Sequence, residues 1–223
     1  MASTIGARLA FDNARAMLQT AGIDPNSAVL SQSVIRTEVA MSTTQTQYQF
    51  PILINDAQAG AASQFNTMRL LNLQDAFIVS ALGFYVAAPA STTATNFPLL
   101  TYPNAQVFTT ANAATSLYSA YNGNLSLTVN NRQIVPSYDL GRHLKVQRTQ
   151  QASGTGTNTN IDSFDASVDG IYPIEPNWTL VGSKNTVVVI TLPSALSAIQ
   201  AGANPRFVLK FYGVLAQNVT PVR

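Results

Sequence analysis

Few residues of this chain could carry catalytic chemistry, and the first of them is a histidine. His143 is the only histidine among 223 residues, and the chain has no cysteine. A Ser–His–Asp hydrolase would have to use His143 as its base, but no serine stands in the G-x-S-x-G setting of a nucleophile elbow. The counts also exclude metal sites built from several histidines or from cysteines. We therefore predict that the protein is not an enzyme and that His143 is a surface or packing residue.

One group of carboxylates could bind a hard cation through oxygen. The sequence NIDSFDASVDG holds candidate metal ligands at Asp162, Asp165 and Asp169. The D-x-D-x-D-G spacing of an EF-hand calcium loop is missing, so the alternative is a solvated loop whose aspartates bond to nearby backbone. The neighbouring SGTGTN lacks the G-x-x-G continuation and the lysine of a nucleotide-binding loop. We predict no resident metal and no cofactor.

A basic stretch, GRHLKVQRTQ at 141–150, interrupts a chain that is otherwise poor in charge. Its cations are Arg142, Lys145 and Arg148. We expect a strand or an extended segment, with Leu144 and Val146 packed beneath a basic rim; a helix would instead stack the three cations on one side. We predict a contact edge that meets either a neighbouring subunit or the phosphates of a nucleic acid.

The overall composition favours a protein that assembles with other subunits over a monomer in solution. Charged residues make up 10% of the chain and hydrophobic residues 46%, with a net charge of +2. Ordinary soluble domains are roughly 25% charged, and contacts between subunits lose charge from their cores. The N-terminus lacks the apolar core of a secretory signal, and the longest apolar run, at 76–90, is too short for a membrane helix. We expect synthesis and function in the cytosol, or release from it by lysis.

The pattern along the chain predicts one helix followed by a β-rich domain. Residues 4–21 have helical periodicity, and Gly22 is placed to end the helix. Arg8 and Arg15 lie on the polar stripe of this helix, where we expect them to contact a neighbouring subunit or nucleic acid. From residue 34 the period changes to two, and roughly eight to ten strands follow.

Some of these strands carry further signals. Arg36 and Glu38 alternate with apolar residues, which places them on the polar face of a half-buried strand, and the runs at 76–86 and 186–192 are apolar on both faces, as central strands are. Asn130 and Asn131 predict a tight hairpin turn within 125–135. A short helical turn is predicted at 194–201. We divide the chain into an N-terminal helical arm and linker at 1–33 and a β-sandwich at 34–223.

Several segments of the chain resemble bacteriophage virion proteins, and the likeness spans most of residues 34–218. The segments that carry it are QYQFPILIND at 47–56, RLLNLQDAFIVSALGFYV at 69–86, YNGNLSLTVNNRQIVPSYDLGRH at 121–143 and RFVLKFYGVLAQN at 206–218.

The resemblance implies a capsid subunit with a fold of the jelly-roll or a related antiparallel β-sandwich type. Such a subunit would be made in a host cytoplasm and located in the virion. Its partners would be other copies of itself, other virion proteins and, through non-specific contacts, packaged nucleic acid. Two alternatives stay open: a decoration or spike protein of the same virion, and a receptor- or carbohydrate-binding sandwich module. In the last case Trp178 and the tyrosines could stack on sugars.

Overall fold

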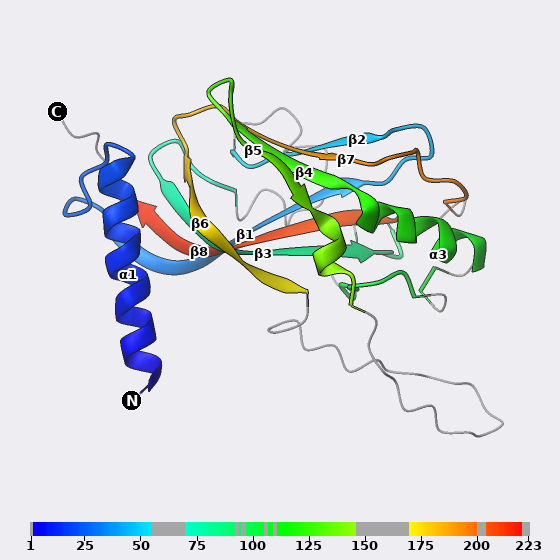
Figure 1. The fold of residues 1–223 in the computed structure, drawn as a ribbon, viewed down its shortest axis with the longest axis horizontal. Helices are drawn as coiled ribbons and strands as arrows, with labels where there is room; N and C mark the ends of the chain where they lie inside the picture. The colour runs from blue at the N-terminus through cyan, green and yellow to red at the C-terminus, as the bar shows by residue number, and fades with distance from the viewer. Residues whose placement is uncertain are drawn as a thin grey trace.

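The computed structural model describes residues 2–54, 70–91, 94, 97–104, 107–108, 111–145, 170–199 and 204–219, with side chains in the first helix described from Phe11 onward. Within these ranges the chain is mainly β and forms two four-stranded antiparallel sheets (Figure 1). The predicted mainly β, antiparallel class is confirmed, and the two sheets are consistent with the predicted sandwich.

The first sheet has the strand order β1-β8-β3-β6, and the second has β2-β7-β4-β5. The strands of the first sheet are β1 (Val29–Ala40), β8 (Arg206–Gln217), β3 (Ala76–Ala87) and β6 (Ile171–Val181). Those of the second are β2 (Gln47–Phe50), β7 (Thr186–Thr191), β4 (Asn124–Val129) and β5 (Arg132–Asp139). The first residues of β1 fall in the range assigned to the linker, and the division of the chain at residue 34 stays a prediction.

Each of the first four strands pairs with one of the last four, taken in reverse order. The chain pairs β1 with β8, β2 with β7, β3 with β6 and β4 with β5, all antiparallel. This is the pairing of one long hairpin whose turn lies between β4 and β5. Two further ladders, β3 with β8 and β4 with β7, join the paired strands into sheets. The four pairs are thus nested, with β4–β5 innermost in the chain and β1–β8 outermost.

The turn of this hairpin was predicted from its residues. Asn130 and Asn131 have φ angles of +48° and +62°, which asparagine tolerates better than most residues because its short polar side chain can bond locally. The backbone is held further by the Asn130 side chain, whose Oδ1 accepts a hydrogen bond of 3.0 Å from the N–H of Asn185.

The core fills the space between the inner faces of the sheets, and two smaller apolar clusters cover the outer face of the first sheet. One lies beneath the helix α1 (Ala2–Thr20), where Ala14 and Leu18 are buried against Ala76 and Ile78. The other includes Tyr85 and Val208 beneath Leu99. Sheet faces that would otherwise be exposed are therefore covered by the chain itself.

The predicted first helix is confirmed, and Gly22 follows it with φ of +77°. Its buried side chains among those described, Ala14 and Leu18, pack on the protein's own sheet, so any reach towards a neighbour stays a prediction. A second helix, α3 (Ala111–Leu117), runs into the 3₁₀ helix η1 (Tyr118–Asn122), and neither was predicted. The helical turn expected at 194–201 is wrong for the described residues up to 199, which form no helix.

Candidate functional site

The basic stretch adopts a different local structure from the one expected. Residues Leu140–His143 form a 3₁₀ helix, η2, rather than a strand. The Asp139 carboxylate caps it by accepting a hydrogen bond of 2.9 Å from the N–H of Gly141, and this local bond favours a turn over a sheet ladder. Leu144 is 38% exposed, so the expected packing beneath a basic rim is wrong for this residue. Val146 and Arg148 lie outside the described residues.

His143 is fully buried at the end of this turn. Its Nδ1 donates a hydrogen bond of 2.7 Å to the carbonyl of Gly170. The rings of Phe84, Tyr138 and Tyr172 surround it, with centroids 5.3 to 6.3 Å from that of the imidazole. Nε2 has no hydrogen-bond partner within the described structure. Of the two roles expected for the lone histidine, surface or packing, the structure shows packing.

This environment keeps the imidazole neutral. Burial lowers the pKa of His143 to about 4, because the charged form loses its hydration, and the hydrogen bond to Gly170 opposes this shift only in part. In the unfolded chain the pKa is near 6.5. The unfolded state therefore binds a proton more strongly than the folded state, and stability present above pH 6.5 is lost as the pH falls towards 4.

We predict that acid destabilises the wild-type protein more than a His143→Gln variant. Between pH 7 and pH 5 the wild type should lose about 2 kcal/mol of unfolding free energy beyond the loss in the variant, from the difference between the two pKa values. Glutamine keeps a donor for Gly170 but does not titrate. Urea unfolding at both pH values measures the difference, and equal losses in the two proteins would contradict the prediction.

Arg142 and Lys145 are the two cations of the basic stretch that the structure describes. The backbone at Lys145 is held by Thr101, which lies outside the turn. Thr101 accepts a hydrogen bond of 3.3 Å from the N–H of Lys145, and its hydroxyl donates one of 2.6 Å to the Lys145 carbonyl. Arg142 lies over the ring of Tyr138, with 5.7 Å between the guanidinium carbon and the ring centroid. Both cations are exposed and can meet an anion from solvent.

Arg15, the other predicted contact residue whose side chain the structure describes, lies away from this place. Arg15 forms an exposed pair with Asp12, at 3.9 Å, on α1. That helix packs near the Ala76 end of β3, whereas Phe84, further along β3, contacts His143. At about 3.3 Å per residue the two places are roughly 26 Å apart along the strand. The side chain of Arg8 and the residues Asp162, Asp165 and Asp169 lie outside the described part of the chain.

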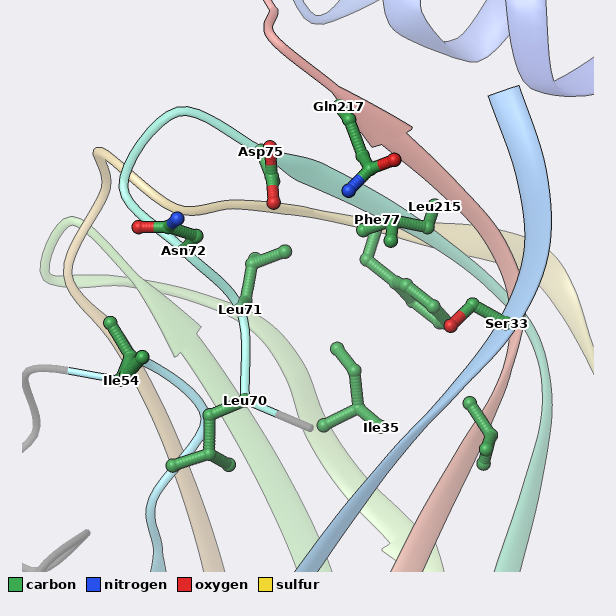
Figure 2. Close-up of a pocket in the computed structure, with 11 residues that line it drawn as sticks. Ser33, Ile35, Ile54, Leu70, Leu71, Asn72, Asp75, Phe77, Leu215 and Gln217 are labelled. Atoms are coloured by element: carbon green, nitrogen blue, oxygen red, sulfur yellow. The ribbon is translucent and has the colours of Figure 1, made fainter. Parts of the chain in front are cut away.

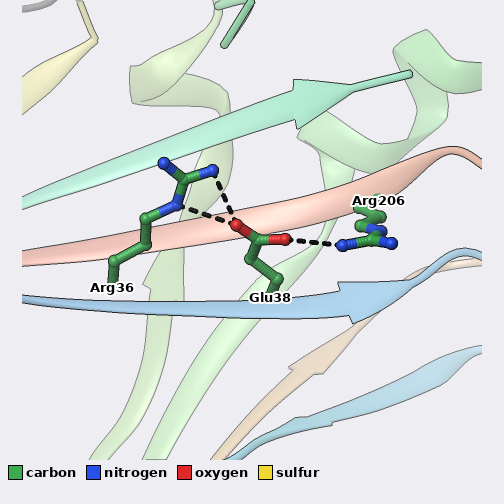
Figure 3. Close-up of polar contacts among 3 residues, drawn as sticks. All are labelled: Arg36, Glu38 and Arg206. Carbon is green, nitrogen blue, oxygen red and sulfur yellow. Dashed lines mark hydrogen bonds and ion pairs between the residues drawn. The ribbon is translucent and has the colours of Figure 1, made fainter. Parts of the chain in front are cut away.

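A buried group of three charges on the outer face of the first sheet was missed in the sequence (Figure 3). One Glu38 oxygen accepts a hydrogen bond of 2.8 Å from Arg36 Nε and lies 2.6 Å from Arg36 Nη2. The other accepts a hydrogen bond of 3.0 Å from Arg206 Nη1. The Glu38 side chain is 0% exposed. Arg36 and Glu38 lie two residues apart on one face of β1, and the alternation of polar and apolar residues predicted that this face is exposed to solvent.

An aromatic residue closes this group. The guanidinium carbons of Arg36 and Arg206 lie 5.3 and 5.9 Å from the ring centroid of Phe97. Phe97 belongs to the connection that follows β3, and Leu100 of the same connection bonds to Val86 through both backbone groups. The three charges thus hold this connection against the sheet, where cation–π attraction adds to packing.

A hollow of about 490 Å³ opens beside β1, between the first sheet and the chain around Ile54 and Leu70 (Figure 2). Ile35 and Leu71 make part of its wall apolar, while Asn72, Asp75 and Gln217 supply polar groups. Asp75 is its one ionisable group within the described residues, and its Oδ1 accepts a hydrogen bond of 3.2 Å from the N–H of Asn218. The lining mixes apolar and polar groups, and its described residues offer no pair of ionisable groups for acid–base chemistry.

The comparisons with known proteins assign no family to this chain. No family model matches this chain, and the curated proteins include none that matches it. Within the described residues no three His, Asp or Glu side chains gather closely enough to hold a metal ion. The same residues contain no helix long and apolar enough to cross a membrane.

Proposed function

We propose that this chain is a structural virion protein, a capsid subunit of the jelly-roll type that associates with its own copies into a shell around a genome. The strand order is the observation that carries the proposal. Pairing β1 to β8, β2 to β7, β3 to β6 and β4 to β5, in sheets ordered 1-8-3-6 and 2-7-4-5, is what winding one long hairpin into two packed sheets produces. Eight-stranded double-sheet jelly rolls occur in viral capsid proteins, lectins and cupins.

The composition favours the capsid among these uses of the fold. A chain with 10% charged residues has a surface suited to contact with neighbours, because the centres of such contacts are depleted of charge. A sugar-binding module needs aromatic faces open to solvent. Trp178, the only tryptophan, is 7% exposed and packs edge-on against Tyr138. Its burial supports the reading of a core residue over a sugar platform.

The exposed cations supply the contact to a second partner. Arg142 and Lys145 extend from a backbone held by Thr101 and by the cap at Asp139, and both side chains are exposed. Anchored cations of this kind suit phosphates, or acidic groups on a neighbouring subunit. We also propose that the N-terminal part of α1, which precedes its described contacts with the sheet, reaches a neighbour.

The proposal predicts that the purified chain assembles into closed particles as its concentration is raised. Electron microscopy and sedimentation velocity would detect them, and a chain that stays monomeric throughout would contradict the proposal. A double variant, Arg142→Gln with Lys145→Gln, separates the two uses of the cations. Normal particles that retain less nucleic acid assign these residues to the genome, whereas loss of particles assigns them to the neighbouring subunit.

A further inference from the structure

The four edge strands differ in how they are protected against pairing with another chain. Edges are commonly blocked by proline, by bulges or by short length. In β5 the blocks are Pro136 and two shifts of register, in β6 they are Pro173 and Pro176, and β2 has only four residues. β1 has none of these devices, since its 12 residues contain no proline and pair with β8 without a shift.

The register shows which backbone groups of β1 point outward. The N–H of Met41 donates a hydrogen bond of 2.9 Å to the carbonyl of Pro205, which continues the pairing of β1 with β8. Hydrogen-bonded pairs alternate in an antiparallel ladder, so the odd-numbered residues of β1 bond to β8 and the even-numbered ones point away. Among the described residues, the outward backbone groups of Leu30, Gln32 and Val34 have no partner.

The side chains of this half of β1 offer no electrostatic protection either. Residues 29–35, VLSQSVI, contain no charge. Val29 is 60% exposed, Gln32 is exposed, and Leu30 and Val34 are half-buried. The first charges along the strand, Arg36 and Glu38, pair with each other. An uncharged edge can meet a copy of itself without placing like charges opposite one another.

We propose that β1 pairs antiparallel with β1 of a second copy about a two-fold axis at Gln32, so that two four-stranded sheets become one. In this register Leu30 lies opposite Val34 of the second copy, and Gln32 lies opposite its own equivalent. All the unpaired outward groups of these residues are then used, in roughly six hydrogen bonds, two for each of three pairs. The contact is isologous, as closed two-fold dimers require.

The glutamine at the axis fits this arrangement. Its amide carries both a donor and an acceptor, so two glutamines facing each other can bond reciprocally. The choice of a second copy as the partner rests on the proposed self-association of this chain. An extended segment of a different protein is the alternative occupant, and the experiment separates the two.

The test uses opposite charges at the axis of the full-length chain. Gln32→Lys and Gln32→Glu each place like charges directly across the interface. Each variant alone should raise the concentration of half-association by about tenfold, whereas an equimolar mixture of the two should restore it to near the wild-type value. Sedimentation velocity across a concentration series measures all three. Because Gln32 is exposed, both variants should fold, and circular dichroism checks this.

Gln49→Lys provides the matched control, since it places the same charge on an exposed residue of β2, an edge of the other sheet. It should leave association unchanged. The proposal is overturned if Gln49→Lys weakens association as much as Gln32→Lys, if neither Gln32 variant weakens it, if the mixture fails to restore it, or if the wild type never associates.

The outcomes also separate this inference from the proposed function. Particles that form equally well from Gln32→Lys would retain the shell and remove the β1 contact. Dimers that the Gln32 variants abolish, with no larger particle at any concentration, would retain the β1 contact and remove the shell. A wild type that never associates with itself would remove both the shell and the β1 contact between copies.

Discussion

Replacing Glu38 with glutamine should lower the free energy of unfolding by about 3 kcal/mol, because removing one member of a buried charged group leaves its partners uncompensated. Arg36 and Arg206 would keep their charges with side chains 15% and 7% exposed, and would have lost the carboxylate that both contact. Glutamine has nearly the same shape, so the loss would report charge rather than volume. Urea unfolding followed by circular dichroism measures it.

The matched control for this variant is Asp12→Asn on α1. That substitution also removes a carboxylate from an arginine, but the Asp12 and Arg15 side chains are 66% and 59% exposed. Exposed pairs of this kind contribute little, so the expected loss is below about 0.5 kcal/mol. Equal losses in the two variants would show that burial of Glu38 carries no energetic weight and would contradict the prediction.

The buried charges also hold the connection that covers part of the outer face of the first sheet. Phe97 lies over both arginines, and the connection after β3 continues from it to the bonds between Leu100 and Val86. If Glu38→Gln loosens this connection, the residues beneath it, among them Tyr85 and Val208, become exposed. In an assembling protein this would change a surface that neighbours can contact, so the variant should be tested for association as well as for stability.

The sequence predicted the features that depend on neighbouring residues. The first helix followed from its periodicity and from Gly22, and the β4–β5 hairpin followed from Asn130 and Asn131. The double-sided apolar runs of β3 and β7 identified inner strands, and each lies between two others in its sheet. These features are local because backbone propensity and turn chemistry act over a few residues.

The features that escaped prediction depend on residues far apart in the chain. Glu38 meets Arg206 across 168 positions, and His143 is buried because Gly170 and the aromatic rings lie around it. Alternation alone placed Glu38 in solvent, since it cannot show that Phe97 and its connection cover that face. The 3₁₀ helix at 140–143 replaced the expected strand because Asp139 offers its carboxylate to the turn.

Replacing Gly213 with alanine should have a similarly large effect, because β8 passes β3 more closely there than a side chain allows. A Cβ atom at Gly213 would lie 1.8 Å from the carbonyl oxygen of Ile78 and 3.2 Å from the Phe77 ring. The register of β3 shifts between Val79 and Ala81 in its ladders to both neighbours, and this bulge brings the Ile78 carbonyl towards β8.

The expected loss of unfolding free energy is about 3 kcal/mol, at the upper end of overpacking, because the atom in the way is backbone in the middle of a sheet and cannot turn aside. Ser80→Ala is the control beside the same bulge. It removes an exposed hydroxyl that donates a hydrogen bond of 3.1 Å to the carbonyl of Tyr212, and should cost about 1 kcal/mol or less. Since β8 joins β1 to the rest of its sheet, Gly213→Ala should also weaken association through β1. An alanine variant as stable as the wild type would mean that the bulge relaxes, and that the close approach of β8 to β3 is not required by the fold.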